Sequence, residues 1–350
     1  MLLYIHIPFC DSKCHYCSFN SYVDLFHLRI VYMEALMVQL RYELERFKVK
    51  EKSIETVFIG GGTPSTVKPE LYRPIFELLA PYIKEGAEIT SEANPNSATA
   101  HWLEGMRALG VNRISFGVQS FDDAKLKKLG RAHQASDATA ALWRAKDAGY
   151  EHLSLDLIYA VDGDTQALLR HDLDEAFKLP IDHLSAYALT IEEGTPFAAT
   201  PEVANEKLAL TEWFLEQIKG HFPSYEISNF GDYHSRHNLG YWQYKPYIGL
   251  GSGAVGALEK SRYYPTQDVQ AYIADPLKIQ TEELSDEAIR TEKIFLGLRS
   301  IVGVDETILN AQELRQARLL VDEKKLRHHG GRFYNDDYLI SDELALFVQQ

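Results

Sequence analysis

The chain has 350 residues, of which 45% are hydrophobic and 25% are charged, and its formal net charge is −14. This length exceeds what one ordinary core fills and predicts two domains, or one large α/β barrel with an appendage. The negative charge disfavours partners that are held through phosphates, so we expect no nucleic-acid partner.

The first half of the sequence alternates short β-branched or aromatic runs with helical stretches, the pattern of βα units that build a parallel sheet. The predicted strands cover 2–7, 56–60, 88–93, 113–119, 152–159 and 183–189. A long amphipathic helix between the first two has apolar residues three or four positions apart from Leu25 to Phe47. Shorter helices are expected near 69–83, 99–109, 136–148 and 165–178. Six βα units predict an α/β fold, a partial (β/α)6 barrel with its chemistry at the carboxyl edge of the sheet.

The regular alternation of strand and helix patterns ends after about residue 200. A helix near 203–219 precedes a tract rich in aromatic residues and glycine. Helical patterns near 285–299 and 305–326, followed by a glycine turn and a possible hairpin in "GGRFYNDDYLISDELALFV", suggest a small winged-helix-like α+β module. The expected parts are therefore a barrel at 1–200, an auxiliary region at 201–280 and a C-terminal module at 281–350.

All cysteines of the chain lie in "YIHIPFCDSKCHYCSFN", where Cys10, Cys14 and Cys17 have the spacing C-x3-C-x2-C. No apolar run reaches the roughly 18 residues of a spanning helix, and the start lacks the features of a signal peptide, so we expect a cytoplasmic protein without a transmembrane segment. An odd number of cysteines there indicates a metal or redox site. Three thiolates can hold three irons of a cubane cluster and leave the fourth iron open. The alternatives are a zinc site completed by His6 or His15, and inert buried thiols.

Polar and glycine residues recur where the predicted strands end. The sequence "GGGTPS" at 60–65 follows a strand, and its glycines permit close approach of a ligand, although it lacks the features of a phosphate loop or a dinucleotide fingerprint. Glu92, Gln119 and Asp156 lie at or near the ends of three successive strands. Each alone would more often cap a strand or face solvent. Their recurrence at one sheet edge indicates a ligand site.

The cysteine motif after "YIHIPF", together with "GGGTPS", "RISFGVQSF" and "DLIYAVDGDT", resembles the radical S-adenosylmethionine superfamily. The resemblance is closer to the oxygen-independent coproporphyrinogen III oxidase family and its HemW-type haem chaperone branch, and it includes "HNLGYW" at 237–242. It implies that Cys10, Cys14 and Cys17 ligate a 4Fe-4S cluster whose open iron takes the amino and carboxylate groups of S-adenosylmethionine. The implied cofactor contacts are Tyr4, Tyr16, Gly61, Gly62, Thr63, Glu92, Gln119, Arg131, Asp156, Ala188 and Val255.

Two departures separate the branches of this family. The oxidases carry another cysteine two residues after the third, where this chain has Phe19, and they have an extended arm before the cysteine loop. Both departures favour the chaperone branch, which implies haem as cargo and a haem-acceptor protein, possibly a respiratory one. Within "HNLGYW", His237 is the candidate axial ligand, and its alternative role is to organise a loop. The alternative functions are an oxygen-independent coproporphyrinogen III oxidase and a zinc-stabilised, non-redox protein. The sequence leaves open whether S-adenosylmethionine is cleaved.

Overall fold

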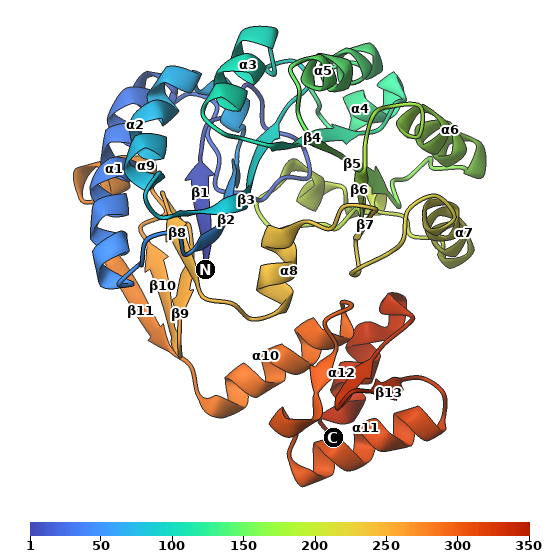
Figure 1. Ribbon diagram of the computed structural model, residues 1–350. Coiled ribbons are helices and arrows are strands. Elements are labelled where there is room, and N and C mark those ends of the chain that lie inside the picture. Colours follow the sequence, from blue (N-terminus) through green and yellow to red (C-terminus); the bar gives the residue numbers. More distant parts are fainter.

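A computed structural model describes residues 1–350, and its centre is one eleven-stranded sheet (Figure 1). Six neighbouring parallel strands follow in chain order: β1 (Leu2–Ile7), β2 (Ile54–Gly61), β3 (Ile83–Ala93), β4 (Arg113–Gln119), β5 (His152–Tyr159) and β6 (His183–Ala188). The connecting helices are α1 (Arg29–Arg46), α2 (Pro69–Leu79), α3 (Ala100–Ala108), α4 (Asp123–Lys128), α5 (Ala135–Asp147) and α6 (Gln166–Ala176). The sheet does not close, because β11 and β7 form its two edges. The predicted partial barrel is confirmed.

The apolar stripe of α1 packs on the sheet as predicted. Tyr32, Leu36, Leu40 and Leu44 are buried at intervals of four, which is one face of a helix. The helix begins at Arg29, after a 3₁₀ turn at Phe26–Leu28, rather than at the first apolar residue of the stripe. The helix expected at 69–83 ends earlier, at Leu79, because the chain enters β3 at once. The short helix α4 was not predicted.

Residues 201–283 extend the same sheet at both of its ends. The 3₁₀ turns η3 (Pro196–Ala199) and η4 (Pro201–Val203) precede the helix expected near 203–219, which begins later than expected as α7 (Leu208–Lys219). One short antiparallel strand joins β6, and β8 is parallel to β1, with Leu2 opposite Tyr247. The elements are β7 (Asn229–Gly231), α8 (Arg236–Trp242), β8 (Tyr247–Leu250), β9 (Gly256–Leu258), β10 (Ser261–Pro265), α9 (Val269–Ala274) and β11 (Ile279–Glu283).

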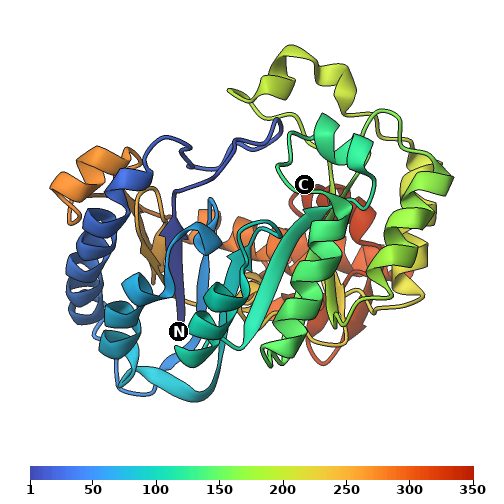
Figure 2. The same cartoon turned by 90° about the horizontal axis from the view of Figure 1, so that it is seen from above.

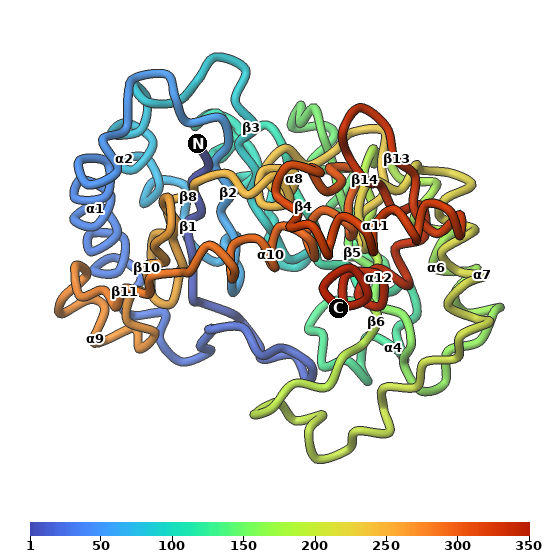
Figure 3. The backbone as a smooth tube through the Cα atoms, turned by 90° about the horizontal axis from the view of Figure 1, so that it is seen from below, coloured from blue at the N-terminus to red at the C-terminus, as the bar shows by residue number.

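The C-terminal residues build a small module with its own apolar core, centred on Ile294, Leu320 and Phe333. Its elements are α10 (Asp286–Leu298), β12 (Val304–Asp305), η5 (Glu306–Ile308), α11 (Ala311–Asp322), β13 (Arg327–His329), β14 (Arg332–Tyr334), η6 (Tyr338–Ile340) and α12 (Ser341–Val348). The module lies on the side of the sheet where the parallel strands begin (Figures 1 and 3). No helix of the chain is both long and apolar enough to cross a membrane.

Two expectations for this module need correction. The helix predicted at 305–326 begins later, because Asn310 caps α11 by accepting from the backbone N–H groups of Gln312 and Glu313. The hairpin pairs β13 with β14 around Gly330 and Gly331, both with positive φ, so its first strand lies before the glycine turn. The end of the segment that was expected to form the hairpin is instead the helix α12. The domain limits near residues 200 and 280 stay a prediction.

Candidate functional site

The cysteine loop follows β1 directly and crosses from its carboxyl end toward α4 (Figure 2). Backbone hydrogen bonds hold the loop at both ends: Cys10 N–H donates to Tyr22 O at 3.0 Å, and His15 N–H donates to Leu129 O at 3.0 Å. Cys10 and Cys14 are buried, whereas Cys17 is half-buried, and all three thiols are free. The loop therefore presents its thiols over the edge where the sequence predicts the site.

Side chains from two other segments donate hydrogen bonds to two of the thiols. Thr63, in the turn after β2, donates from Oγ1 to Cys10 Sγ at 3.3 Å, and Arg131 Nη1 donates to Cys14 Sγ at 3.3 Å. Asn94, after β3, joins the two donors, because its Nδ2 donates to Thr63 Oγ1 at 3.2 Å and its Oδ1 accepts from Arg131 Nη2 at 2.7 Å. Burial raises the pKa of the Cys10 thiol, and the Thr63 hydrogen bond opposes that shift.

The donor set fits an iron–sulfur cubane better than a single metal ion. No group of three or more His, Cys, Asp and Glu side chains in the chain is gathered closely enough to hold one ion. In a cubane each thiolate binds a different iron, so its ligands stand farther apart. Neither histidine of the zinc alternative joins the thiols: His6 bonds through its two ring nitrogens to Tyr4 OH and Asn20 O, and His15 Nδ1 bonds to Lys128 O.

The glycine turn brings backbone close to the cysteine loop. A Cβ atom on Gly62 would lie 2.8 Å from Ile7 O, 2.9 Å from Phe9 O and 3.1 Å from Cys10 Sγ. Gly61 has a φ of +110°, which favours glycine, and its N–H donates to Glu92 Oε2 at 3.1 Å. The absence of side chains here is what lets the turn and the thiol loop meet.

Glu92 and Asp156 form an acidic pair inside the barrel. Burial raises the pKa of Glu92 to about 8, assisted by the charge of Asp156, while the Gly61 N–H opposes the shift. Burial also raises the pKa of Asp156 to about 6, against hydrogen bonding from Ser185 and the positive charge of Arg113. Both side chains keep some exposure, and Glu92 lines a cavity beside the cysteine loop. An incoming ammonium or hydroxyl group would find acceptors there.

The other predicted contacts spread around the same edge. Gln119, at the end of β4, has a φ of +72°, a conformation that is strained for a residue with a side chain. Tyr16 lies beside Arg131 and Cys14, and burial raises its pKa. Ala188 is the last residue of β6. The structure thus gathers these residues with the cysteines at the carboxyl ends of the parallel strands.

Two cavities meet the barrel, and Tyr4 lines both. One, of about 590 Å³, also touches Glu92, Gly61 and the exposed Phe19 next to the cysteine loop. The other, of about 920 Å³, lies against α8 and α10 and is lined by His237 and by Val255. Val255 lines this second cavity, and its contact with the cofactor stays a prediction.

His237 has no free ring nitrogen. Its Nδ1 is 2.7 Å from Thr56 Oγ1 and its Nε2 is 2.9 Å from Tyr241 OH, while its ring stacks on Phe58 with the centroids 5.1 Å apart. Burial and the charge of Arg113 lower its pKa to about 3, so the imidazole is neutral. In this geometry the histidine organises its surroundings, and its role as a haem ligand stays a prediction.

Two residues of the site were not predicted. Asn94 bridges Thr63 and Arg131, and its one signal in the sequence is its position directly after the third strand. Arg113, at the start of β4, is buried, and its charge opposes the rise in the pKa of Asp156 and helps to lower the pKa of His237. Nothing in the local sequence distinguishes a buried arginine from an exposed one.

Comparisons with known proteins agree with this geometry. Residues 4–176 match the Radical SAM superfamily. The "Heme chaperone HemW" of Bacillus subtilis is 34% identical over 322 residues, which cover 87% of this chain and 84% of the relative. The mouse "Radical S-adenosyl methionine domain-containing protein 1, mitochondrial" is 36% identical over 334 residues, or 86% and 74% of the two chains. The structure of coproporphyrinogen III oxidase (HemN) from Escherichia coli is similar in fold, with a TM-score of 0.82, 18% identity and coverage of 99% and 89%.

Proposed function

The chain belongs to the radical S-adenosylmethionine superfamily and to the HemW branch within it, and from that premise we propose that it is a haem chaperone that passes haem to an acceptor protein. The observation that carries the proposal is Phe19, which stands where the oxidase branch has a further cysteine. Its side chain is 61% exposed beside the cysteine loop and lines the cavity next to Glu92. No thiol is therefore present at this position, while the three cysteines of the motif and the polar residues around them are present.

Cys10, Cys14 and Cys17 would hold a 4Fe-4S cluster, with S-adenosylmethionine on its open iron. When bound, the pair would supply an electron to the sulfonium and a 5'-deoxyadenosyl radical. The chain's own residues bind and orient the ligand. Glu92 and Asp156 offer acceptors to ammonium and hydroxyl groups, and Arg131 offers donors to a carboxylate. The remaining contacts in this proposal are Tyr4, Tyr16, Gly61, Gly62, Thr63, Gln119, Ala188 and Val255.

Haem is the cargo in this proposal, and the acceptor is a second protein in the cytoplasm, with a respiratory protein as one candidate. Support comes from relatives that bear the name heme chaperone and that this chain covers over most of their length. The second cavity supplies the apolar and aromatic lining that a haem requires, with His237 at its inner wall. The acidic net charge of the chain is compatible with a protein partner and not with a nucleic acid.

A second candidate function is oxidative decarboxylation of coproporphyrinogen III. The observation that favours it is the intact set of polar groups around the thiols, since Thr63, Asn94 and Arg131 are all hydrogen-bonded in one network. A site for radical chemistry would use that network without change. Phe19 is the residue that separates the two functions.

The test is an anaerobic incubation of the cluster-reconstituted protein with dithionite, S-adenosylmethionine and coproporphyrinogen III, followed by chromatography of tetrapyrroles and 5'-deoxyadenosine. We expect no protoporphyrinogen, and a separate titration with hemin should show one haem bound per chain. Protoporphyrinogen formed over many turnovers would make the protein an oxidase. Failure of the pure protein to bind hemin would overturn the chaperone proposal.

A further inference from the structure

The larger cavity lies between the sheet extension, α8 and the C-terminal module. Its floor is formed by β8 to β10, and α10 supplies one wall through Ile289, Lys293 and Leu296. Its volume of about 920 Å³ is in the range of pockets that enclose whole small molecules. Aromatic rings face it from several elements: Tyr4, Phe58, Tyr241, Tyr244 and Tyr247. The cavity is therefore suited to a large, flat, mostly apolar ligand.

The charges around the cavity single out one lysine. Three of its cationic side chains are paired with carboxylates: Lys245 with Glu55 at 2.7 Å, Lys260 with Asp286 at 2.7 Å and Arg262 with Glu292 at 2.5 Å.

The fourth, Lys293, has no carboxylate within 4.0 Å and lies over the ring of Tyr244, 5.1 Å from its centroid. It is half-buried on an otherwise apolar wall of α10. A cation in that position is stabilised when a ligand brings a carboxylate.

The hydrogen bonds of His237 single out a neighbouring oxygen. In the tautomer that carries its proton on Nδ1, His237 donates to Thr56 Oγ1, and its Nε2 accepts the phenolic proton of Tyr241 and fixes the direction of that hydroxyl. The ring of Tyr241 is held edge-on by Tyr247, with centroids 4.8 Å apart. Tyr241 is partly exposed in the cavity, whereas His237 is 1% exposed. The accessible group of this pair is the phenol oxygen.

Resting on the proposed function, we propose that haem binds in this cavity with Tyr241 as the ligand of ferric iron, His237 as the residue that positions it, and Lys293 paired with a propionate carboxylate. The iron exchanges a bound water for the phenolate oxygen, and the phenolic proton passes to solvent. Tyrosine is an established axial ligand of haem iron in other proteins. Because Lys293 belongs to α10, the C-terminal module takes part in holding the cargo.

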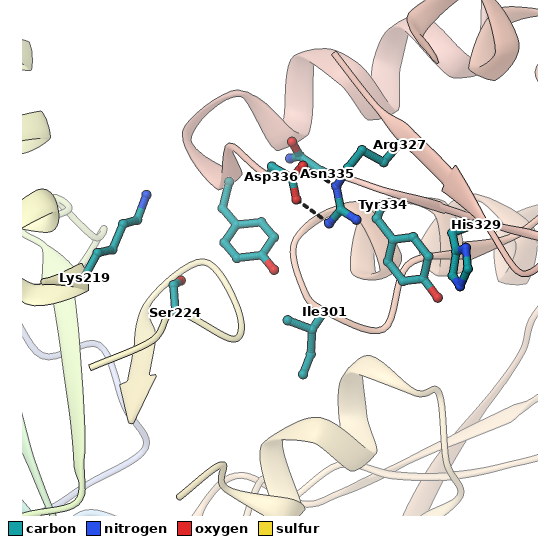
Figure 4. A pocket seen from close by; sticks show the side chains of 9 residues that line it. Lys219, Ser224, Ile301, Arg327, His329, Tyr334, Asn335 and Asp336 are labelled. Carbon is teal, nitrogen blue, oxygen red and sulfur yellow. Dashed lines mark hydrogen bonds and ion pairs between the residues drawn. The ribbon is translucent and has the colours of Figure 1, made fainter. Parts of the chain in front are cut away.

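A second hollow in the same module lacks these features. It measures about 510 Å³ and lies between α7 and the β13–β14 hairpin (Figure 4). Arg327 is already paired with Asp336 there, and Lys219 is exposed to solvent. The hollow thus presents no unpaired, half-buried cation beside an aromatic wall.

The pairing with Lys293 is tested by removing each partner in turn. Cluster-reconstituted wild-type protein and Lys293→Met are titrated with hemin and with hemin whose two propionates are methyl esters. We expect each single change to weaken binding about tenfold, and the ester to cost nothing further in Lys293→Met. Lys260→Met, which removes a cation already paired with Asp286, should keep the ester effect. An ester effect as large in Lys293→Met as in wild type overturns the pairing.

The ligand is tested by resonance Raman and absorption spectra of the ferric haem complex. Wild type and Tyr42→Phe, whose side chain is exposed on α1, should show tyrosinate-to-iron charge transfer, which Tyr241→Phe should lose. His237→Gln should shift the band while keeping the oxygen ligand, which a merely structural role would not predict. Loss of iron ligation in His237→Gln with an unchanged spectrum in Tyr241→Phe would overturn the assignment. If the wild-type protein binds no hemin, the proposed function is overturned instead, so failure of the ligand assignment and failure of the proposed function are distinguishable.

Discussion

Oε2 of Glu92 accepts the backbone N–H of Gly61 at 3.1 Å, so a carboxylate of β3 is tied to the glycine turn at the end of β2. This hydrogen bond favours the ionised form of the Glu92 carboxyl group, whereas burial favours its protonated form. The ionisation of this carboxyl group therefore affects both the stability of the ligand-free protein and its affinity for a cationic ligand.

Glu92→Gln should stabilise the ligand-free protein at alkaline pH. The pKa of Glu92 is about 8 in the folded state against 4.5 in the unfolded chain, so its favourable contribution is complete below pH 4.5 and is lost as pH rises through 8. Because glutamine does not ionise, Glu92→Gln does not lose this stability as the pH rises. Thermal unfolding followed at pH 6 and pH 9 should show a smaller drop in Tm for Glu92→Gln than for wild type, and equal drops would contradict the assignment.

Binding of S-adenosylmethionine should have the opposite dependence on pH. The positive charge of its sulfonium and the N–H groups of its iron-bound amine favour ionised Glu92, so Glu92 has to ionise on binding below pH 8. Affinity should therefore increase up to tenfold for each pH unit from 6 to 8 and then level off. Calorimetric titration of the cluster-reconstituted protein measures this, and Glu92→Gln should bind weakly with little dependence on pH. A steep dependence that survives in the variant would assign the titration to another group.

Gly62→Ala should displace the cysteine loop. The added methyl group would meet two backbone carbonyl oxygens at 2.8 and 2.9 Å, and backbone atoms yield less easily than the tip of a side chain. We expect a loss of about 2 kcal/mol or more in the free energy of unfolding, together with poor cluster incorporation. Gly220→Ala is the matched control, since its Cβ would meet nothing closer than 3.4 Å. Urea unfolding and iron analysis of both variants decide the point.

Each of Cys10→Ser, Cys14→Ser and Cys17→Ser should abolish the cubane. Serine replaces the thiol with little change of shape, so the fold should persist while the brown absorbance and bound iron and sulfide fall to background. Ser18→Ala, within the same loop, should keep the cluster. Full iron content in any of the serine variants would show that its cysteine is not a ligand.

Glu88→Ala should loosen α8 and weaken haem binding. The buried carboxylate accepts from Tyr233 OH at 2.9 Å and from the backbone N–H groups of Arg236 at 2.8 Å and His237 at 3.0 Å. Leaving these donors unpaired should cost about 3 kcal/mol in unfolding free energy. Glu216→Ala, on the exposed face of α7, should change it little. Haem affinity unchanged in a destabilised Glu88→Ala would place the cargo away from α8.

The parallel strands could be predicted because each is a short buried run with β-branched or aromatic residues between helices. β1 and β5 have the predicted limits. The helix α4 could not be predicted, since "DAKLKK" has only two buried residues and no apolar stripe. The strands after residue 229 are short, and their pairing with β1 and β6 depends on contacts far apart in the sequence. Periodicity within a segment carries no information about such partners.

The candidate site shows the same limit at the level of single residues. Cys10, Cys14 and Cys17 share one motif, so their proximity follows from the sequence. The link from Cys10 through Thr63 and Asn94 to Arg131 joins four separate segments, and the resemblance supplied three of those residues but not Asn94. The partner of His237 Nδ1 is Thr56, 181 residues away, and no reading of "HNLGYW" alone could reveal that this nitrogen is engaged.

The placement of β1 has a consequence for the order of events during translation. This strand leaves the ribosome long before one of its two neighbours, β8, whose first residue is Tyr247. Until that residue has been made, one edge of β1 keeps its N–H and C=O groups without partners, and the cysteine loop extends from a half-paired strand. The strand that carries the cysteine loop is thus completed only after β8 has been made, and we expect iron–sulfur insertion to follow synthesis rather than accompany it.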